Sequence, residues 1–324
     1  MESTARESRP DIPLLGAALL TLVLWASAFV AIRLAMREYP AGSLALLRFL
    51  VAGIALALYQ LVRPSNRIGL PARRHLPSLV MAGLVGITLY HVALNAGERT
   101  VTAGSASLIV SLSPIFTALF ATVSLGERLG ALGWAGVLTG FAGAAVVSLS
   151  EQGTVRLGAG SLLVLIAAIA QAVYFVLQKP LLLRYRPLEV TSYAIWLGTI
   201  GLLPFAGELW RTLGRASQEA TAAGIYLGLL PGAAAYLSWS YVLSRLPAGR
   251  AASTLYLVPP LAIMIAWVVL GEQPSPRALL GGSIVLLGVG LVNSSGYSRL
   301  TQWRGRRRDR FASAPAGPTP RSHR

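Results

Sequence analysis

A histidine with polar neighbours lies inside one of the apolar stretches of this chain. Thr88, His91 and Asn95 recur at helical spacing within LVGITLYHVALNAGE, so their side chains project from one side of a helix. A histidine in such company could serve a serine nucleophile as general base, or it could line a polar cavity. No motif singles out a nucleophilic serine, and the absence of cysteine excludes thiolate nucleophiles and thiolate metal sites. The pattern favours a cavity; the plainer alternative for His91 is a hydrogen bond to a carbonyl of a neighbouring helix.

Other polar and aromatic side chains occur at the same depth. Gln171, Tyr174 and Gln178 form a stripe at i, i+3 and i+7 that is too polar to face lipid. Trp25, like Trp196 and Trp239, lies midway along an apolar stretch, whereas membrane tryptophans usually collect at the interfaces. Simple packing is the alternative for each aromatic residue. Together they predict a cavity suited to small organic molecules, with these lining residues: Trp25, Tyr90, His91, Asn95, Ser111, Gln171, Tyr174, Tyr193, Trp196, Tyr236, Trp239 and Tyr256.

A charged residue and two matched prolines within the apolar stretches stand out. Arg48 is the only charged residue well inside one, where it could snorkel to the headgroups, bind a substrate carboxylate or pair across helices. Pro114 and Pro259 are expected to kink their helices, and the carbonyls that they free must be satisfied by protein or by water in a cavity. Glu127 and Glu272 follow glycines at the ends of apolar stretches, so capping of helices is their expected role.

The elements that must position these residues are membrane-spanning helices. Of the 324 residues, 54% are hydrophobic and only 12% are charged, which is too apolar for a soluble domain of this length. A helix needs about 20 mostly apolar residues to cross the hydrocarbon. Ten segments meet that need: 13–34, 41–62, 76–96, 101–124, 130–149, 158–180, 189–207, 221–244, 250–270 and 276–294. We therefore predict an all-α integral membrane protein with ten transmembrane helices.

Basic residues predict the orientation of these helices. With the N-terminus inside, the segments on the inner side carry 20 Lys and Arg and those on the outer side carry 7. Both termini are therefore expected in the cytoplasm. Much of the net charge of +16 lies in the tail 295–324, which is rich in Arg, Pro, Ala and Ser and is expected to be disordered. A membrane protein needs no nucleic acid to explain such charge, and none is expected as a partner.

The chain repeats itself. Residues 101–148 align with 246–293 at a constant offset of 145 and share 13 identities without a gap. Among the matches are Pro114 with Pro259, Gly136 with Gly281, and Gly143 with Gly288. Five spans are an odd number, so a second copy would enter the bilayer from the opposite side. Two inverted five-helix repeats can open a site at the membrane midplane first to one side and then to the other.

Several stretches resemble a known family. LWASAFVAIRLAM at 24–36, LALLRFLVAG at 44–53, SPIFTALFATVSLGERL at 113–129 and GVLTGFAGAAVVS at 136–148 are similar to the EamA-type members of the drug/metabolite transporter superfamily. The resemblance covers about residues 12–294. It implies an N-tail (1–11), a first EamA repeat (12–150), a second repeat (157–294) and the basic tail. It also implies a transporter, typically an exporter of amino acids or other small metabolites. Arg48 departs from the repeat, because Ala194 takes its place in the second copy.

These observations lead to a functional hypothesis. We expect an alternating-access carrier in a bacterial-type inner membrane that exports amino acids or similar amphiphilic metabolites, with the lipid bilayer and a small-molecule substrate as its partners. An enzyme is not expected; the alternatives are an intramembrane serine hydrolase and a passive channel. No Asp or Glu lies mid-membrane, so proton coupling would run through His91 or ordered water, and facilitated export fits equally. No cofactor or metal is expected, and association into a homodimer is left open.

Overall fold

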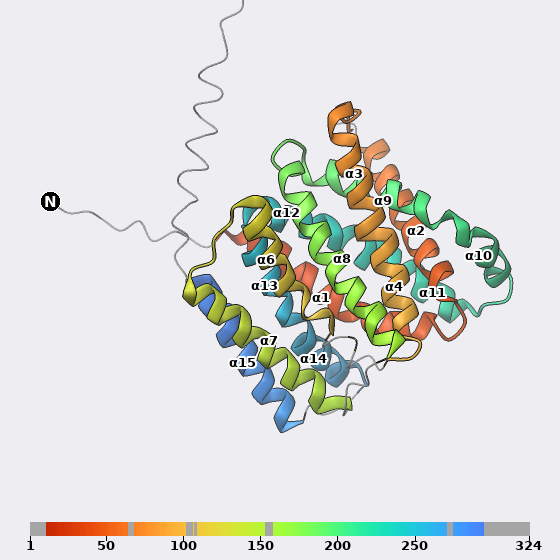
Figure 1. Cartoon of the computed structure of the whole chain (residues 1–324). Coiled ribbons are helices and arrows are strands. Elements are labelled where there is room, and N and C mark those ends of the chain that lie inside the picture. The colour runs from red at the N-terminus through yellow and green to blue at the C-terminus, as the bar shows by residue number, and fades with distance from the viewer. Residues whose placement is uncertain are drawn as a thin grey trace, which may run out of the picture.

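The computed structural model describes residues 11–63, 68–101, 106, 109–152, 158–270 and 275–294. Within these ranges every regular element is a helix (Figure 1). Six helical stretches are long and apolar enough to cross a membrane: Ile12–Ala35, Ala41–Val62, Arg73–Gly97, Ala159–Leu181, Pro187–Leu213 and Gln218–Arg245. Shorter apolar helices span Ser113–Leu125, Ala131–Val146 and Leu279–Ser294. An all-helical protein with several membrane spans is thus confirmed, and ten spans stay a prediction.

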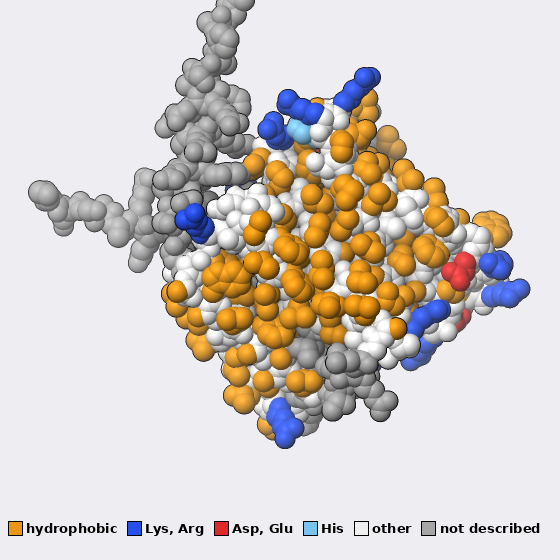
Figure 2. Space-filling model, viewed as in Figure 1, with side chains coloured by type: hydrophobic (Ala, Val, Ile, Leu, Met, Phe, Trp, Pro, Cys, Tyr) orange, Lys and Arg blue, Asp and Glu red, His pale blue; other side chains and the backbone are white. Residues whose placement is uncertain are grey.

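The surface has the character expected of a protein in lipid. Figure 2 shows hydrophobic side chains spread over most of the visible face, with Lys and Arg gathered toward its edges. Large apolar side chains such as Val123, Val268 and Leu286 are more than half exposed. In water such a surface would be unfavourable, whereas in a bilayer it faces hydrocarbon.

The two halves of the chain contain corresponding elements. The first half comprises α1 (Ile12–Ala35), α2 (Ala41–Val62), η2 (Arg73–His75), α3 (Leu76–Gly83), η3 (Leu84–Leu89), α4 (Tyr90–Gly97), α6 (Ser113–Leu125) and α7 (Ala131–Gln152). The second comprises α8 (Ala159–Leu181), α9 (Pro187–Leu202), η4 (Leu203–Phe205), α10 (Ala206–Leu213), α11 (Gln218–Leu227), η5 (Gly228–Ala234), α12 (Ala235–Arg245), α13 (Ala248–Ser253), η6 (Thr254–Leu257), α14 (Val258–Leu270) and α15 (Pro276–Ser294). The expected tails lie outside the described residues, apart from Asp11, and so does Glu272.

The correspondence extends to irregular backbone. Shifted by 145 residues, α6 coincides with α14 at both ends, and α7 begins where α15 begins. The π-helical turn η3 falls within η5 under the same shift. Because π-helical turns are rare in proteins, their presence at one position of both copies indicates that a structural unit, and not only a sequence pattern, is repeated.

Packing between the halves is reciprocal. Helix α1 packs against α12 and α14, and its counterpart α8 packs against α4 and α6. Corresponding helices also pair directly, α2 with α9 and α7 with α15. The crossed contacts join the two halves into one bundle, so a site between them takes residues from both.

The pair α7 and α15 runs antiparallel along one side of the bundle (Figure 1). A Cβ atom added at Gly136 would lie 2.7 Å from the carbonyl oxygen of Gly288, and one at Gly143 would lie 2.8 Å from that of Gly281. The contacted residue on α15 moves from 288 to 281 as the residue on α7 moves from 136 to 143, so the two helices run in opposite directions. Small residues of this kind let membrane helices approach closely, and the glycines that match between the repeats are the ones in contact.

Polar contacts also join the halves at the bundle's ends. The hydroxyl of Tyr39 lies 2.7 Å from Oγ1 of Thr221, while that of its repeat counterpart Tyr185 lies 2.8 Å from Nδ1 of His75. Glu127 accepts hydrogen bonds from the N–H groups of Ala248 and Gly249, at distances of 2.9 and 3.3 Å. The capping role expected for Glu127 is therefore present, at the start of α13 in the other half.

Candidate functional site

A cavity lies where α1, α2, α4 and α6 of the first half meet α8, α12 and α14 of the second. Its empty volume is about 730 Å³, part of it open to solvent. Most of the lining is apolar, and the polar side chains among the described residues are few. The lining residues are Trp25, Ala28, Phe29, Ile32, Arg48, Tyr90, His91, Leu94, Val110, Ser111, Pro114, Gln171, Tyr236, Leu255, Val258 and Pro259.

The structure brings many of the expected residues to this cavity. Its walls include Trp25, Arg48, Tyr90, His91, Ser111, Pro114, Gln171, Tyr236 and Pro259. The remaining expected residues, Asn95, Tyr174, Tyr193, Trp196, Trp239 and Tyr256, do not line it. The two prolines are repeat counterparts that face the same space from α6 and α14.

Trp25 forms an aromatic wall that contacts both halves. Its indole Nε1 donates to the carbonyl of Pro231 in η5 over 3.3 Å. Its ring centroid lies 5.5 Å from that of Tyr236 in an edge-on arrangement, and 5.5 Å from that of Trp239 behind it. Edge-to-face contacts at this spacing are favourable. Trp239 is almost completely buried and supports the wall without reaching the cavity.

His91 is held in one orientation by two partners. Nδ1 lies 3.0 Å from the carbonyl oxygen of Ile87, one turn earlier, and must donate because a carbonyl only accepts. Nε2 lies 3.4 Å from the hydroxyl of Tyr236, and in the neutral ring it accepts a hydrogen bond from that hydroxyl. The ring of Phe49 packs edge-on at 4.5 Å. Neither nitrogen pairs with a serine among the described residues, so the arrangement is that of a neutral polar wall.

Arg48 brings a cation to the cavity. Its side chain is only 5% exposed, so it does not reach the headgroups as snorkelling would require. A Cβ at Gly228 would lie 2.6 Å from the carbonyl oxygen of Arg48, and one at Gly232 would lie 3.7 Å from its Cγ. These glycines of η5 therefore let α2 approach closely at this point. The guanidinium carbon lies 5.4 Å from the centre of the Phe49 ring, and the buried Nε has no hydrogen-bond acceptor among the described residues.

A second polar region lies away from the cavity and contains no open space. We call Tyr174, Gln178, Thr191 and Ser240 the polar cluster; all four are buried. Nε2 of Gln178 donates to the Tyr174 hydroxyl at 2.8 Å and to Ser240 Oγ at 3.2 Å, and Thr191 Oγ1 donates to Ser240 Oγ at 2.7 Å. The expected stripe on α8 is thus divided: Gln171 lines the cavity, while Tyr174 and Gln178 belong to the cluster.

The other expected residues connect helices. Nδ2 of Asn95 donates to the carbonyl of Ala41 at 3.0 Å, and Nε1 of Trp196 donates to that of Gly53 at 3.1 Å. Tyr256 packs over Gly140, where an added Cβ would lie 2.6 Å from its ring. The hydroxyl of Tyr193 donates to the carbonyl of Gly69.

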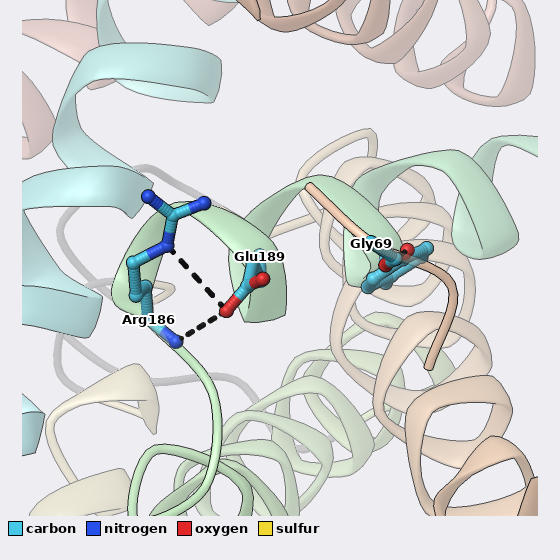
Figure 3. A network of polar contacts seen from close by, with 4 residues as sticks. Gly69, Arg186 and Glu189 are labelled. Carbon is cyan, nitrogen blue, oxygen red and sulfur yellow. Dashed lines mark hydrogen bonds and ion pairs between the residues drawn. The ribbon is translucent and has the colours of Figure 1, made fainter. Parts of the chain in front are cut away.

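Figure 3 shows the surroundings of that last contact, at the start of α9. The N–H of Arg186 donates to Glu189 Oε2 at 2.7 Å, and the Nε atom of Arg186 lies 3.7 Å from the same oxygen. These contacts cap the first turn of the helix. Tyr193 therefore connects α9 to the segment before η2.

Sequence reasoning missed the apolar part of the lining. Phe29 and Ile32 follow Trp25 by four and seven residues and therefore share its helix face, a signal that was available. Leu94 follows Tyr90 by four residues and Leu255 precedes Pro259 by four, so the same signal applied to them. Val258 carried no such signal, because an apolar side chain facing a cavity has the same sequence pattern as one facing lipid.

Comparison with known proteins identifies the family. The model of the EamA-like transporter family matches twice, over residues 13–149 and 158–294. A "probable terminal-alkyne amino-acid exporter" of Streptantibioticus cattleyicolor is 43% identical over 279 residues, which are 86% of this chain and 92% of that protein. The "uncharacterized transporter YdfC" of Bacillus subtilis is 36% identical, over 83% of this chain and 87% of that protein.

More distant relatives agree. The "uncharacterized inner membrane transporter YedA" of Escherichia coli is 27% identical over 89% of this chain and 93% of that protein. A crystal structure that covers 88% of this chain and 96% of its own superposes with a TM-score of 0.72 at 22% sequence identity, which shows a shared fold. The resemblance to EamA-type drug/metabolite transporters is therefore confirmed, and the chain belongs to the EamA-like transporter family as a membrane transporter with two EamA repeats.

Proposed function

We propose that this transporter exports amino acids or similar small amphiphilic metabolites by alternating access, with the cavity as the substrate site. The observation that carries the proposal is the origin of the lining: Trp25 and His91 come from one repeat and Gln171 and Tyr236 from the other. A movement of one repeat against the other must therefore change the site. The exporter from Streptantibioticus cattleyicolor, similar over most of its length, supports an amino-acid class of substrate.

The proposal includes ten spans in two inverted repeats, with both termini in the cytoplasm of a bacterial-type cell. The antiparallel run of α7 and α15 and the reciprocal contacts of α1 and α8 support the inversion. The π-helical turns η3 and η5 are natural places for bending, because π-helical turns often occur at functional sites within helices. All the described residues of the lining come from one chain.

Efflux from proteoliposomes tests this proposal. Vesicles loaded with each of the twenty proteinogenic amino acids, labelled, should show protein-dependent and saturable efflux for at least one of them. Counterflow, in which unlabelled substrate on one side drives labelled substrate the other way, separates a carrier from a channel. Repeating the measurement with an imposed pH gradient shows whether a proton moves as well. Lack of efflux across the whole panel would contradict the proposal.

Two variants test whether the efflux uses this cavity. His91→Ala should reduce efflux strongly, because His91 forms a wall and orders Tyr236. Leu286→Ala is a suitable control, since Leu286 is 63% exposed on the outer face of α15. Equal effects of the two substitutions would separate transport from this cavity.

A further inference from the structure

We propose that Arg48 anchors the carboxylate of the substrate and that no side chain of opposite charge reads the substrate's amino group. The inference rests on the proposed function and narrows its substrate class. The cavity would accept small apolar carboxylates whether or not the amino group is free, and would reject the corresponding amides.

Arg48 carries a buried positive charge. A guanidinium stays protonated in proteins, so this side chain carries a full positive charge into the cavity wall. It is 5% exposed, its Nε has no acceptor among the described residues, and Glu98, the carboxylate that acts on it, is too far away to form an ion pair. A buried charge without a partner is strongly unfavourable. A bound anion would supply the missing partner.

A carboxylate is the anion that best fits Arg48. A guanidinium presents donors in a planar fork that matches the two oxygens of a carboxylate. Phe29, Ile32 and Leu94 line the same cavity and provide an apolar surface for the rest of the molecule. A multiply charged anion such as a phosphate ester would favour several fixed cations, whereas Arg48 is the only Lys or Arg among the described residues of the lining. The chemistry points to a monocarboxylate with an apolar body.

Among the described residues, the lining offers no charged partner to an amino group. No Asp or Glu is among the described residues that line the cavity, so no fixed negative charge faces an ammonium there. The neutral groups of Gln171, Tyr90 and Ser111 can accept a hydrogen bond from an amine or an amide N–H alike. Masking the amino group with an acetyl group should therefore be tolerated, whereas removing the carboxylate's charge should not.

Binding measurements on the purified full chain in detergent test the inference with three matched ligands. L-leucine and N-acetyl-L-leucine, but not L-leucinamide, should raise the melting temperature. Arg48→Gln should raise the half-maximal concentration for the two acids about 10-fold or more, because it removes a charge-assisted hydrogen bond. Arg48→Lys, which keeps the charge without the fork, should lie between. Arg33→Gln is the matched control, since Arg33 is exposed in the last turn of α1.

Stability without ligand separates an anchor from a structural residue. If Arg48 serves to bind the anion and not to stabilise the fold, Arg48→Gln removes an unpaired buried charge. The melting temperature of the protein without ligand should then stay the same or rise. A lowered melting temperature together with unchanged ligand binding would overturn the inference. So would binding of leucinamide as tight as that of leucine, or absence of binding by both acids.

These outcomes are distinct from failure of the proposed function. Efflux of an amino acid whose amide is transported equally well would leave the exporter intact and remove the anchor. Binding of both acids that depends on Arg48, without efflux of any amino acid in the panel, would keep the anchor and remove the exporter.

Discussion

The cavity and the polar cluster occupy comparable places in the two repeats, yet one is hollow and the other is filled. Ala28 and Ile32 of α1 face the cavity, and their repeat counterparts at an offset of 146 are Tyr174 and Gln178 of the cluster. The large polar side chains thus occupy on one side the room that small and apolar ones leave open on the other. At Arg48 the larger and more polar side chain lies at the cavity instead, because its repeat counterpart Ala194 is a small buried residue.

This difference shows what a carrier built from two repeats must change during its cycle. Opening the filled side would expose Gln178, Thr191 and Ser240, whose hydrogen bonds would have to be remade with water. Under the proposed alternating access, we expect the cluster to act as a polar seal that breaks and re-forms, since water can replace each of its hydrogen bonds. A seal made only of apolar packing could not be rewetted as easily.

The largest effect is expected when a cavity residue is replaced by its counterpart from the other repeat. Ser111 lines the cavity, whereas its counterpart at an offset of 145 is the buried Tyr256. Ser111→Tyr should place a ring in the cavity and reduce transport to near the background of empty vesicles, because the substrate's room is taken. The melting temperature should change little, since an open cavity accepts the ring. Efflux and thermal unfolding are the measurements.

Ser111→Ala is the control for that substitution. It removes the hydroxyl and keeps the space, so transport should largely persist. If Ser111→Tyr transported as well as Ser111→Ala, the substrate would have to pass elsewhere.

Cysteine labelling compares the accessibility of the cavity and of the polar cluster directly. The natural chain has no cysteine, so a single introduced thiol is the only target. A membrane-impermeant methanethiosulfonate reagent should react with Ser111→Cys at least about 10-fold faster than with Ser240→Cys, because Ser240 is fully buried in the cluster. Adding a transported substrate should increase the reactivity of Ser240→Cys. Equal reactivity of the two thiols without substrate would show that the cluster does not seal.

Much of the architecture could be predicted from the sequence because it depends on periodicity. Apolar runs of sufficient length gave the spans, and the matched glycines gave the repeat before their contact across α7 and α15 was visible. Trp25 and Gln171 are repeat counterparts at an offset of 146, and both line the cavity. The count of spans was harder, because α6 is only 13 residues long as described and residues 102–105 before it lie outside the description.

The depth and rotation of side chains could not be predicted in the same way. Gln171 and Gln178 share one helix face, but seven residues of helix rise about 10 Å, which is enough to separate the cavity from the cluster. Asn95 was expected at the cavity as a polar side chain at membrane depth, and Trp196 as a tryptophan midway along its span. Their side chains instead donate to the carbonyls of Ala41 and Gly53. Which carbonyl lies within reach depends on how whole helices are rotated against each other.

A smaller effect is expected from weakening the cluster. Gln178→Leu removes the donor shared by the Tyr174 hydroxyl and Ser240, and it places an apolar group among buried polar atoms. We expect a loss of about 1–3 kcal/mol in stability, because buried polar groups lose their partners. Gln171→Leu is the control on the same helix face, where the cavity leaves more freedom. Thermal unfolding of both variants would decide; an equal loss would mean that the cluster is no tighter than the cavity wall.

The last comparison concerns an ionisable group beside the cavity. Glu98 directly follows α4, the helix that carries His91 and Leu94, and its repeat counterpart is the buried Leu243. Burial raises the pKa of the Glu98 carboxyl from 4.5 to about 7, although Arg33 and Arg48 act to lower it. The folded protein then holds a proton that the unfolded chain releases, so stability should fall as the pH rises from about 4.5 to 7. The slope is at most about 1.4 kcal/mol per pH unit, and less where solvent reaches the carboxyl.

Glu98→Gln should flatten this dependence, with Glu219→Gln, in the first turn of α11, as the control. Melting temperatures measured from pH 4.5 to 8 would reveal it, and an unchanged slope in Glu98→Gln would assign the pH dependence to another group.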